Sequence, residues 1–210
     1  MKIVVFGASG GTGTLIVEQA LSAGYEVLAF VRNPAKLAIK HLQLTIVQGD
    51  VLVSAQVEQA IAGQDAVVSA LGPTRPFVPG MLGTSTKNIT AAMQKHNVRR
   101  LISTGGTIMR DPQDHPTAVD RLIQFLMRLP GREILRDVEN SSALIRASNL
   151  DWTIARYPMH LTDGPHTGHY RTGYLGKNVS MQLSRADGAD FVIQELSKGE
   201  FIKKAPVISY

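Results

Sequence analysis

Short apolar runs, rich in β-branched residues, recur along the chain between longer amphipathic segments. A run of this kind, bounded by turn residues, is typical of a strand that is buried on both faces of a parallel sheet. The runs predict strands at residues 2–6, 26–31, 44–48, 66–70, 100–104, 152–156 and 206–208.

The segments between these strands carry apolar residues at helical spacing. In the first of them, the stretch LIVEQAL puts its apolar residues on one face, and Gly24 ends the pattern. Another helix is expected to begin at Ser54, whose side chain would cap it. Together with the helix that begins at Ser54, the pattern predicts helices at residues 12–23, 84–96, 117–129, 132–148 and around 185–196.

The alternation of strands and helices predicts an α/β fold, namely a Rossmann-like, doubly wound parallel sheet with right-handed crossovers. No linker, repeat or low-complexity tract divides residues 1–210, and this length suits one large domain. We therefore expect a single domain, in which the irregular stretch at about residues 158–178 forms a loop that covers the substrate.

Composition narrows the possible functions. The chain has no cysteine, which excludes disulfides, thiolate metal sites and thiol catalysis and fits a reducing compartment. Its net charge is +5, but the basic residues are dispersed and aromatic residues make up only 6%, so we expect no nucleic-acid partner. The start does not read as a signal peptide and no stretch is apolar enough to span a membrane, so a cytoplasmic protein with no membrane partner is expected.

The stretch VVFGASGGTGTLIVEQAL joins the first predicted strand to the first predicted helix. It places Gly7, Gly10 and Gly13 in the turn, where a backbone must bend sharply, approach a pyrophosphate and pack a helix against a strand. The N-terminus of that helix offers unpaired N–H groups and a partial positive charge to phosphates. This position between a strand and a helix predicts a dinucleotide site.

The residue type at the end of the second predicted strand distinguishes an NAD(H) site from an NADP(H) site. NAD-binding folds carry an acidic residue there, which binds the ribose hydroxyls. This chain instead has Arg32, in FVRNPAK, and its guanidinium suits the 2′-phosphate of NADP(H), to which Lys36 would add a second cation. Asp50, after the third strand, is expected near the adenine, and residues 70–72 under the nicotinamide ribose. The sequence therefore predicts NADP(H) as the cofactor.

The chain resembles the NmrA-like, atypical short-chain dehydrogenases/reductases, and most closely the biliverdin-IXβ reductase/flavin reductase group. The likeness rests on FGASGGTG, VQGDVL, AGQDAVVSALG, NITAAMQKHNVRRLI, the more specific LDWTIARYPMHLTDGPHTGHY and the terminal ISY. It implies a monomer that uses NADPH as hydride donor and a conjugated acceptor such as a flavin, a quinone or a tetrapyrrole. It also implies cofactor contacts from Gly7, Ser9, Gly10, Gly11, Thr12, Gly13, Arg32, Lys36, Asp50, Val51, Leu71, Gly72 and Arg75.

The chain departs from the usual pattern at the catalytic residues. It contains no Tyr-x-x-x-Lys, and the Cys-Thr-Ser of the family is Thr104-Gly105-Gly106 here. Thr104 is expected on the nicotinamide side and the two glycines would leave room for a ring, while His160 matches a histidine at the mouth of the active site. Because water can supply the proton to a flat acceptor, we predict a reductase of flavins, quinones or related conjugated acceptors.

Two other functions remain open. One is a non-catalytic, NADP(H)-sensing regulator of the NmrA-like kind, and the other is a sugar-nucleotide-type epimerase or isomerase, which would normally need the absent Tyr/Lys pair. No metal is expected, because the acidic and histidine residues of HLTDGPHTGH lie in a loop without the helical spacing that orients metal ligands. The stretch RDPQDHP is interpreted as a solvated loop.

Overall fold

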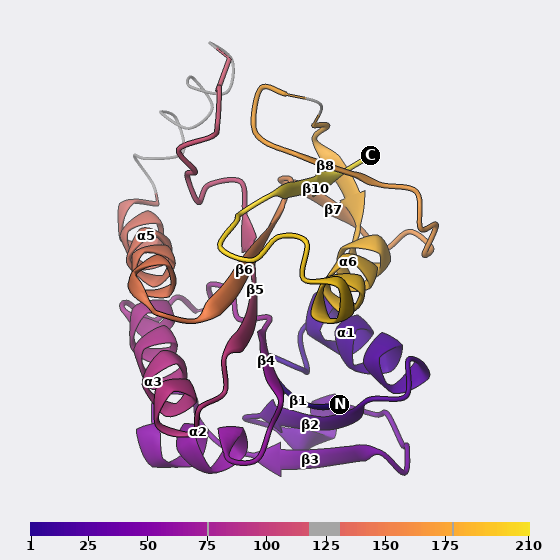
Figure 1. Ribbon diagram of the computed structural model, residues 1–210, viewed down its shortest axis with the longest axis vertical. Coiled ribbons are helices and arrows are strands. Elements are labelled where there is room, and N and C mark those ends of the chain that lie inside the picture. The colour runs from indigo at the N-terminus through magenta and orange to yellow at the C-terminus, as the bar shows by residue number, and fades with distance from the viewer. Residues whose placement is uncertain (75, 118–130, 178) are drawn as a thin grey trace.

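A mostly parallel sheet runs through the protein, with helices on both of its faces (Figure 1). The computed structural model describes residues 1–74, 76–117, 131–177 and 179–210. Within these residues the main sheet has eight strands, in the order β3-β2-β1-β4-β5-β6-β10-β8. They are β1 (Lys2–Phe6), β2 (Glu26–Val31), β3 (Leu44–Gln48), β4 (Ala66–Ser69), β5 (Arg100–Gly106), β6 (Asp151–Tyr157), β8 (Arg171–Gly173) and β10 (Val207–Ser209).

The strand order identifies the fold. β2 and β3 lie on one side of β1, while β4, β5 and β6 follow on the other side, and all of these strands are parallel. The chain therefore reverses its direction of winding between β1 and β4. In doubly wound sheets, ligands bind outside the carboxyl ends of the strands at such a reversal. The predicted Rossmann-like single domain is confirmed.

Helices cover the two faces of the sheet in two groups (Figure 1). Helices α1 (Gly11–Ser22) and α6 (Arg185–Lys198) lie together on one face. On the other face lie α2 (Ser54–Ile61), α3 (Met81–Lys95) and α5 (Arg132–Ala147).

The apolar run of β1 explains this two-sided arrangement. Ile3 and Val5 pack in the core beneath α1 and α6, whereas Val4 and Phe6 pack in the core beneath α2, α3 and α5. All four side chains are fully buried. Because both faces of β1 are covered, its sequence is an uninterrupted apolar run rather than an alternating one.

The predicted cap of α2 and the helix predicted at residues 117–129 have different outcomes. Ser54 is not the cap of α2 but its first residue; the cap is Val53, and no side chain caps the helix. The helix predicted at 117–129 lies, apart from Thr117, outside the described residues.

The stretch at residues 158–178 is more ordered than the sequence predicts. A short strand, β7 (His160–Thr162), pairs in parallel with β9 (Gln182–Ser184) to form a small second sheet. Further on, β8 pairs antiparallel with β10 at the edge of the main sheet. These strands pair with residues distant in sequence, so no local apolar pattern marks them.

Candidate functional site

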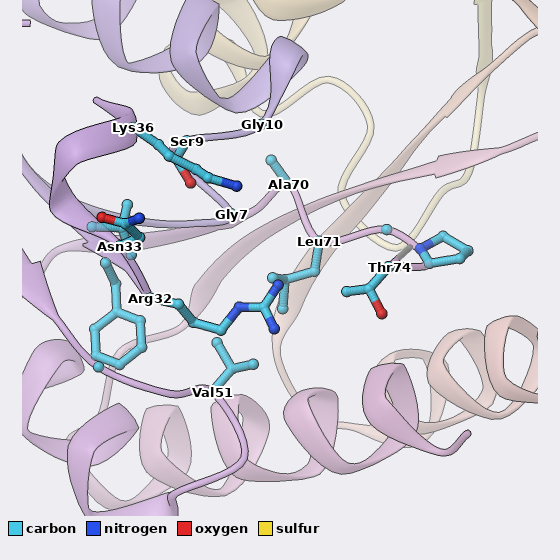
Figure 2. Close-up of a pocket in the computed structure, with 15 residues that line it drawn as sticks. Gly7, Ser9, Gly10, Arg32, Asn33, Lys36, Val51, Ala70, Leu71 and Thr74 are labelled. Atoms are coloured by element: carbon cyan, nitrogen blue, oxygen red, sulfur yellow. The ribbon is translucent and has the colours of Figure 1, made fainter. Parts of the chain in front are cut away.

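A cavity of about 530 Å³ opens at the carboxyl ends of β1, β2, β3 and β4, where the winding of the sheet reverses (Figure 2). Its wall is made by residues at the ends of these strands and in the turns that follow them. The lining residues are Gly7, Ser9, Gly10, Phe30, Val31, Arg32, Asn33, Lys36, Gly49, Val51, Ala70, Leu71, Gly72, Pro73 and Thr74.

The glycine-rich turn forms one wall of this cavity, and two of its glycines are required by the backbone. Gly7 has a φ of +76°, and a Cβ there would lie 2.6 Å from the carbonyl oxygen of Ala70 at the end of β4. A Cβ on Gly13 would overlap the carbonyl oxygen of Gly7. The turn is closed by a 3.0 Å hydrogen bond from the backbone N–H of Gly10 to that same oxygen. Glycines at these positions therefore let α1 and β4 approach the turn closely.

The N-terminus of α1 is open to a ligand. Gly10 caps the helix without any side-chain hydrogen bond, and the first turn contains no acidic residue. The first N–H groups of a helix have no partner within the helix, and together with the helix dipole they attract anions. The start of α1 can thus bind a phosphate group.

The opposite wall carries two cations. Arg32 follows β2, and a short 3-10 turn, η1 (Pro34–Lys36), begins two residues later. The side-chain oxygen of Asn33 caps this turn by accepting a 3.0 Å hydrogen bond from the N–H of Ala35. The cap and Pro34 fix the backbone so that Lys36 extends over the cavity, as Arg32 does (Figure 2).

Within the described part of the chain, no acidic side chain neutralises Arg32 or Lys36. Both residues are exposed, and no carboxylate in the described part of the chain lies within 4.0 Å of either cation. The backbone oxygen of Arg32 accepts a 3.2 Å hydrogen bond from the Gln48 amide, which leaves the guanidinium available. Two unpaired cations at the rim of a cavity suit an anionic ligand with more than one charge.

Asp50 and Val51 take different positions after β3. The Asp50 carboxylate accepts a 2.9 Å hydrogen bond from the N–H of Leu52, and its own N–H donates to the Gln56 amide at 2.8 Å, so it stabilises the turn that leads into α2. Asp50 does not line the cavity, whereas the neighbouring Val51 is buried and does.

Apart from Asp50, the sequence-predicted cofactor residues divide into three groups. Those that line the cavity are Gly7, Ser9, Gly10, Arg32, Lys36, Val51, Leu71 and Gly72. Gly11, Thr12 and Gly13 form the first turn of α1 beside it. Arg75 lies outside the described residues.

Other lining residues are absent from the predicted set. They are Phe30, Val31, Asn33, Gly49, Pro73 and Thr74, whereas Ala70 was expected with Leu71 and Gly72. Most of them sit next to a predicted residue at a strand end, so the topology could have found them. Phe30 carried no such signal, because it lies inside β2; its ring packs against Gly49, where a Cβ would overlap it.

The two predicted catalytic residues lie apart from this cavity. Thr104 is buried on β5, where it pairs with Ala155 of β6. His160 is exposed on β7, and its backbone N–H donates to the carbonyl of Met181 at 3.2 Å. Neither is among the lining residues. Their catalytic roles stay predictions.

The space beside Gly105 is occupied. A Cβ at Gly105 would overlap the sulfur of Met109, which is itself buried, so this glycine leaves no room for a ligand ring. At Gly106, in contrast, a Cβ would meet nothing closer than Ile108 at 3.7 Å. The expectation that both glycines leave room for a ring stays a prediction, and at Gly105 it would require the Met109 side chain to move.

The stretch RDPQDHP is solvated only in part: His115 is exposed, as its sequence suggests, but the side chains of Asp111 and Asp114 are buried. Asp114 is bound by both Nη atoms of Arg156, at 2.7 and 2.8 Å, and Arg156 is fully buried at the end of β6. Arg156 also donates to the carbonyls of Met109 and Ala205. In addition, Asp114 accepts from the N–H of Leu175 at 3.1 Å. This buried pair joins the loop after β5 to β6 and to the segment after β8.

A second buried carboxylate anchors the loop after β7. Asp187, in the first turn of α6, accepts hydrogen bonds from the N–H and hydroxyl of Thr167, the N–H of Gly168 and the hydroxyl of Tyr210, all at 2.8–2.9 Å. Burial of Asp187 raises the pKa of its carboxyl, but these four bonds outweigh that effect and lower the pKa to about 2. Asp187 is therefore ionised at neutral pH, and it fixes the loop to α6.

The hydroxyl of Tyr157 is not free to act as an acid. Tyr157 ends β6, and its hydroxyl donates to the carbonyl of Gly188 at 2.8 Å. Burial raises the pKa of Tyr157, so the hydroxyl stays protonated and engaged. It does not replace the tyrosine of the absent Tyr-x-x-x-Lys motif.

The described ranges contain neither a cluster of metal ligands nor a helix that could span a membrane. In residues 1–74, 76–117, 131–177 and 179–210, no three acidic or histidine side chains gather as a metal site. In the loop after β7, Asp163 pairs with Arg185, and His166 lies 3.3 Å from Asp190. None of the helices in these ranges combines the length and apolar character that a membrane span requires.

The cavity and the fold define a class of protein. A glycine turn at a helix N-terminus, in a doubly wound sheet and opposite unpaired cations, is the architecture of a dinucleotide site. Residues 7–198 match the model of the NAD(P)H-binding family, so the chain belongs to that family. Its relatives include NAD(P)H-dependent reductases, which is the class that the sequence predicts.

Individual proteins that resemble the chain share at most a modest fraction of its sequence. The chain is 29% identical over 129 residues to cinnamoyl-CoA reductase 1 of Oryza sativa subsp. japonica, which covers 56% of this chain and 38% of that enzyme. A candidate NADH-flavin reductase from Streptococcus pneumoniae superposes with a TM-score of 0.79 at 25% identity, over 100% of this chain and 99% of that one. A short-chain dehydrogenase/reductase from Veillonella parvula, solved with NADP, shares the fold with a TM-score of 0.82 at 18% identity, over 100% and 94% of the two chains.

Proposed function

We propose that the protein is an NADPH-dependent reductase that transfers hydride to a flat, conjugated acceptor of the flavin or quinone class. The cofactor would lie across the carboxyl ends of the strands, with its pyrophosphate at the N-terminus of α1 and its adenosine half between Arg32 and Val51. The residues that line the cavity suit this arrangement, because the turn offers N–H groups and the opposite wall offers cations.

The observation that carries the choice of NADPH is the pair of unpaired cations, Arg32 and Lys36, at the end of β2. The 2′-phosphate carries nearly two negative charges, and a guanidinium can bind it with two parallel hydrogen bonds. An NAD site would need a carboxylate at this strand end for the ribose hydroxyls.

The choice of acceptor rests on the residues available for proton transfer. The chain has no Tyr-x-x-x-Lys, and the Tyr157 hydroxyl is held by Gly188. Reduction of a ketone needs a donor for the developing alkoxide, whereas a flavin or quinone can take its proton from water. The likeness to the Streptococcus pneumoniae candidate NADH-flavin reductase supports the same class of acceptor, although that name specifies NADH.

The test is oxidation of NADPH, followed at 340 nm with FMN, FAD and a soluble quinone in turn. Acceleration that depends on both protein and acceptor is expected. As a control, the same protein should be assayed with NADH at equal concentration. If the protein binds NADPH but no acceptor accelerates its oxidation, the reductase proposal is refuted. That result would support a regulator that senses NADP(H), which is the alternative that the absence of Tyr-x-x-x-Lys favours.

A further inference from the structure

Arg185 lies against the glycine turn, although it comes from the far end of the chain. It is the first residue of α6, which packs beside α1 (Figure 1). Its Cδ and Nε atoms lie 3.4 Å from the place that a Cβ on Gly11 would take. The two helices are joined there by a 2.9 Å hydrogen bond from the Gln19 amide to the carbonyl of Ala186. The position of Arg185 is therefore set by the packing of α6 on α1.

The charges differ between the two helix ends that meet here. The N-terminus of α1 has no side-chain cap and no acidic residue in its first turn, so its partial positive charge is not offset there. The N-terminus of α6, in contrast, is capped by the Ser184 hydroxyl and carries Asp187 in its first turn. Arg185 thus places a full positive charge beside the uncapped start of α1, where an anion that binds to α1 can also contact the guanidinium.

The present partner of Arg185 is a weak one. Its Nη1 bonds to the Asp163 carboxylate at 2.5 Å, but the Asp163 side chain is 91% exposed. Exposed ion pairs contribute little, since water and salt screen them. A phosphate group held by the amides of α1 can therefore displace Asp163 from the guanidinium.

We propose that Arg185 binds the pyrophosphate of the nicotinamide cofactor and gives up Asp163 when it does so. This inference rests on the proposed function, because it concerns the same cofactor. Asp163 follows β7, three residues after His160, so the exchange links cofactor binding to the loop that carries the proposed acceptor-facing histidine. Asp163 and the cofactor compete for one guanidinium, and cofactor binding is therefore coupled to release of Asp163, while Asp187 still holds Thr167 and Gly168.

The coupling predicts changes of opposite sign for the two partners. Affinities for NADPH and NADH are measured by titrating nucleotide fluorescence. Arg185→Gln should weaken both cofactors about 10-fold, because both contain the pyrophosphate that this charged hydrogen bond would hold. Asp163→Asn should tighten both by about two- to fivefold, because it removes the competing carboxylate. Lys198→Gln, which removes an exposed cation at the other end of α6, should change neither by more than about twofold.

The outcomes separate this inference from the proposed function. If the wild type binds neither cofactor, both are refuted together. The exchange alone is overturned if the wild type and Arg185→Gln bind NADPH equally well. It is also overturned if Asp163→Asn weakens NADPH binding as much as Arg185→Gln does. Arg185→Lys, which keeps the charge, should retain most of the affinity. A loss in Arg185→Lys equal to that in Arg185→Gln, with unchanged melting curves, would mean that the guanidinium shapes the turn and binds no phosphate.

Discussion

Removal of the Asp114 carboxylate should destabilise the protein severely, although Asp114 lies in a charged loop. The perturbation is Asp114→Ala. It deletes the acceptor of four hydrogen bonds, two from Arg156 at 2.7 and 2.8 Å, one from the N–H of Asp111 at 2.9 Å and one from the N–H of Leu175 at 3.1 Å. The Arg156 guanidinium is fully buried, so it would keep its charge without a counterion.

The magnitude follows from that burial. Breaking a buried ion pair by removing one partner costs about 3–5 kcal/mol, because the remaining charge is desolvated and uncompensated. In a protein of this length, each kcal/mol moves the melting temperature by about 2–4 °C. Asp114→Ala should therefore lower the melting temperature by about 6–20 °C.

The assay is urea unfolding followed by the fluorescence of Trp152, the single tryptophan, which is buried on β6. Arg99→Ala is the matched control: Arg99 binds Asp151 with two hydrogen bonds of 3.0 and 3.1 Å, but its side chain is 59% exposed. It should cost less than about 1 kcal/mol.

Two comparisons decide the result. If Asp114→Ala costs no more than Arg99→Ala, burial does not set the strength of the Arg156 pair and the reasoning is wrong. The double variant Asp114→Leu with Arg156→Met should lose less stability than Asp114→Ala, because it leaves no buried charge.

Three further predictions concern the loop, the acid limit and the cofactor. His160→Ala should raise the KM for the acceptor and leave the Kd for NADPH unchanged; an unchanged KM with earlier melting would give His160 a structural role only. Because the pKa of Asp187 is lowered to about 2, its contribution of about 2 kcal/mol is present above about pH 4 and is lost as pH falls from about 4 to 2. Tyr210→Phe removes one of its donors and should move this loss in acid-unfolding curves to higher pH, and an unchanged curve would contradict the assignment. NADPH at 100 times its Kd should stabilise the native state by about 2.7 kcal/mol in a thermal melt, whereas a melt that millimolar NADPH leaves unmoved would reject the cofactor.

The parts of the fold that the sequence could predict are those with local causes. β1 could be predicted from its sequence because both of its faces are buried and its residues therefore form an uninterrupted apolar run. Gly7 and Gly13 are recognisable because the turn that contains them cannot accept a Cβ. Arg32 could be found by position, since it is the residue directly after β2. Each of these signals lies within one strand, one turn or one helix.

The parts that the sequence did not predict depend on partners that are distant along the chain. Asp114 looks like a solvated residue until Arg156, on β6, is placed beneath it. The anchoring of Thr167 requires Asp187 from α6, and nothing near either residue indicates the contact. Arg185 likewise reaches the glycine turn only because α6 packs on α1. Such pairs follow from the packing of elements, which one sequence does not specify.

The most direct test of the central claim is the ratio of the affinities for NADPH and NADH. A charge-assisted contact to the 2′-phosphate is worth about 1.5–3 kcal/mol, so the wild type should bind NADPH about 10–150-fold more tightly at low salt. In the double variant Arg32→Ala with Lys36→Ala, NADPH binding should weaken until the ratio approaches one, while the Kd for NADH stays nearly constant. Equal binding of both cofactors by the wild type, or an equal loss of both in the double variant, would contradict the account.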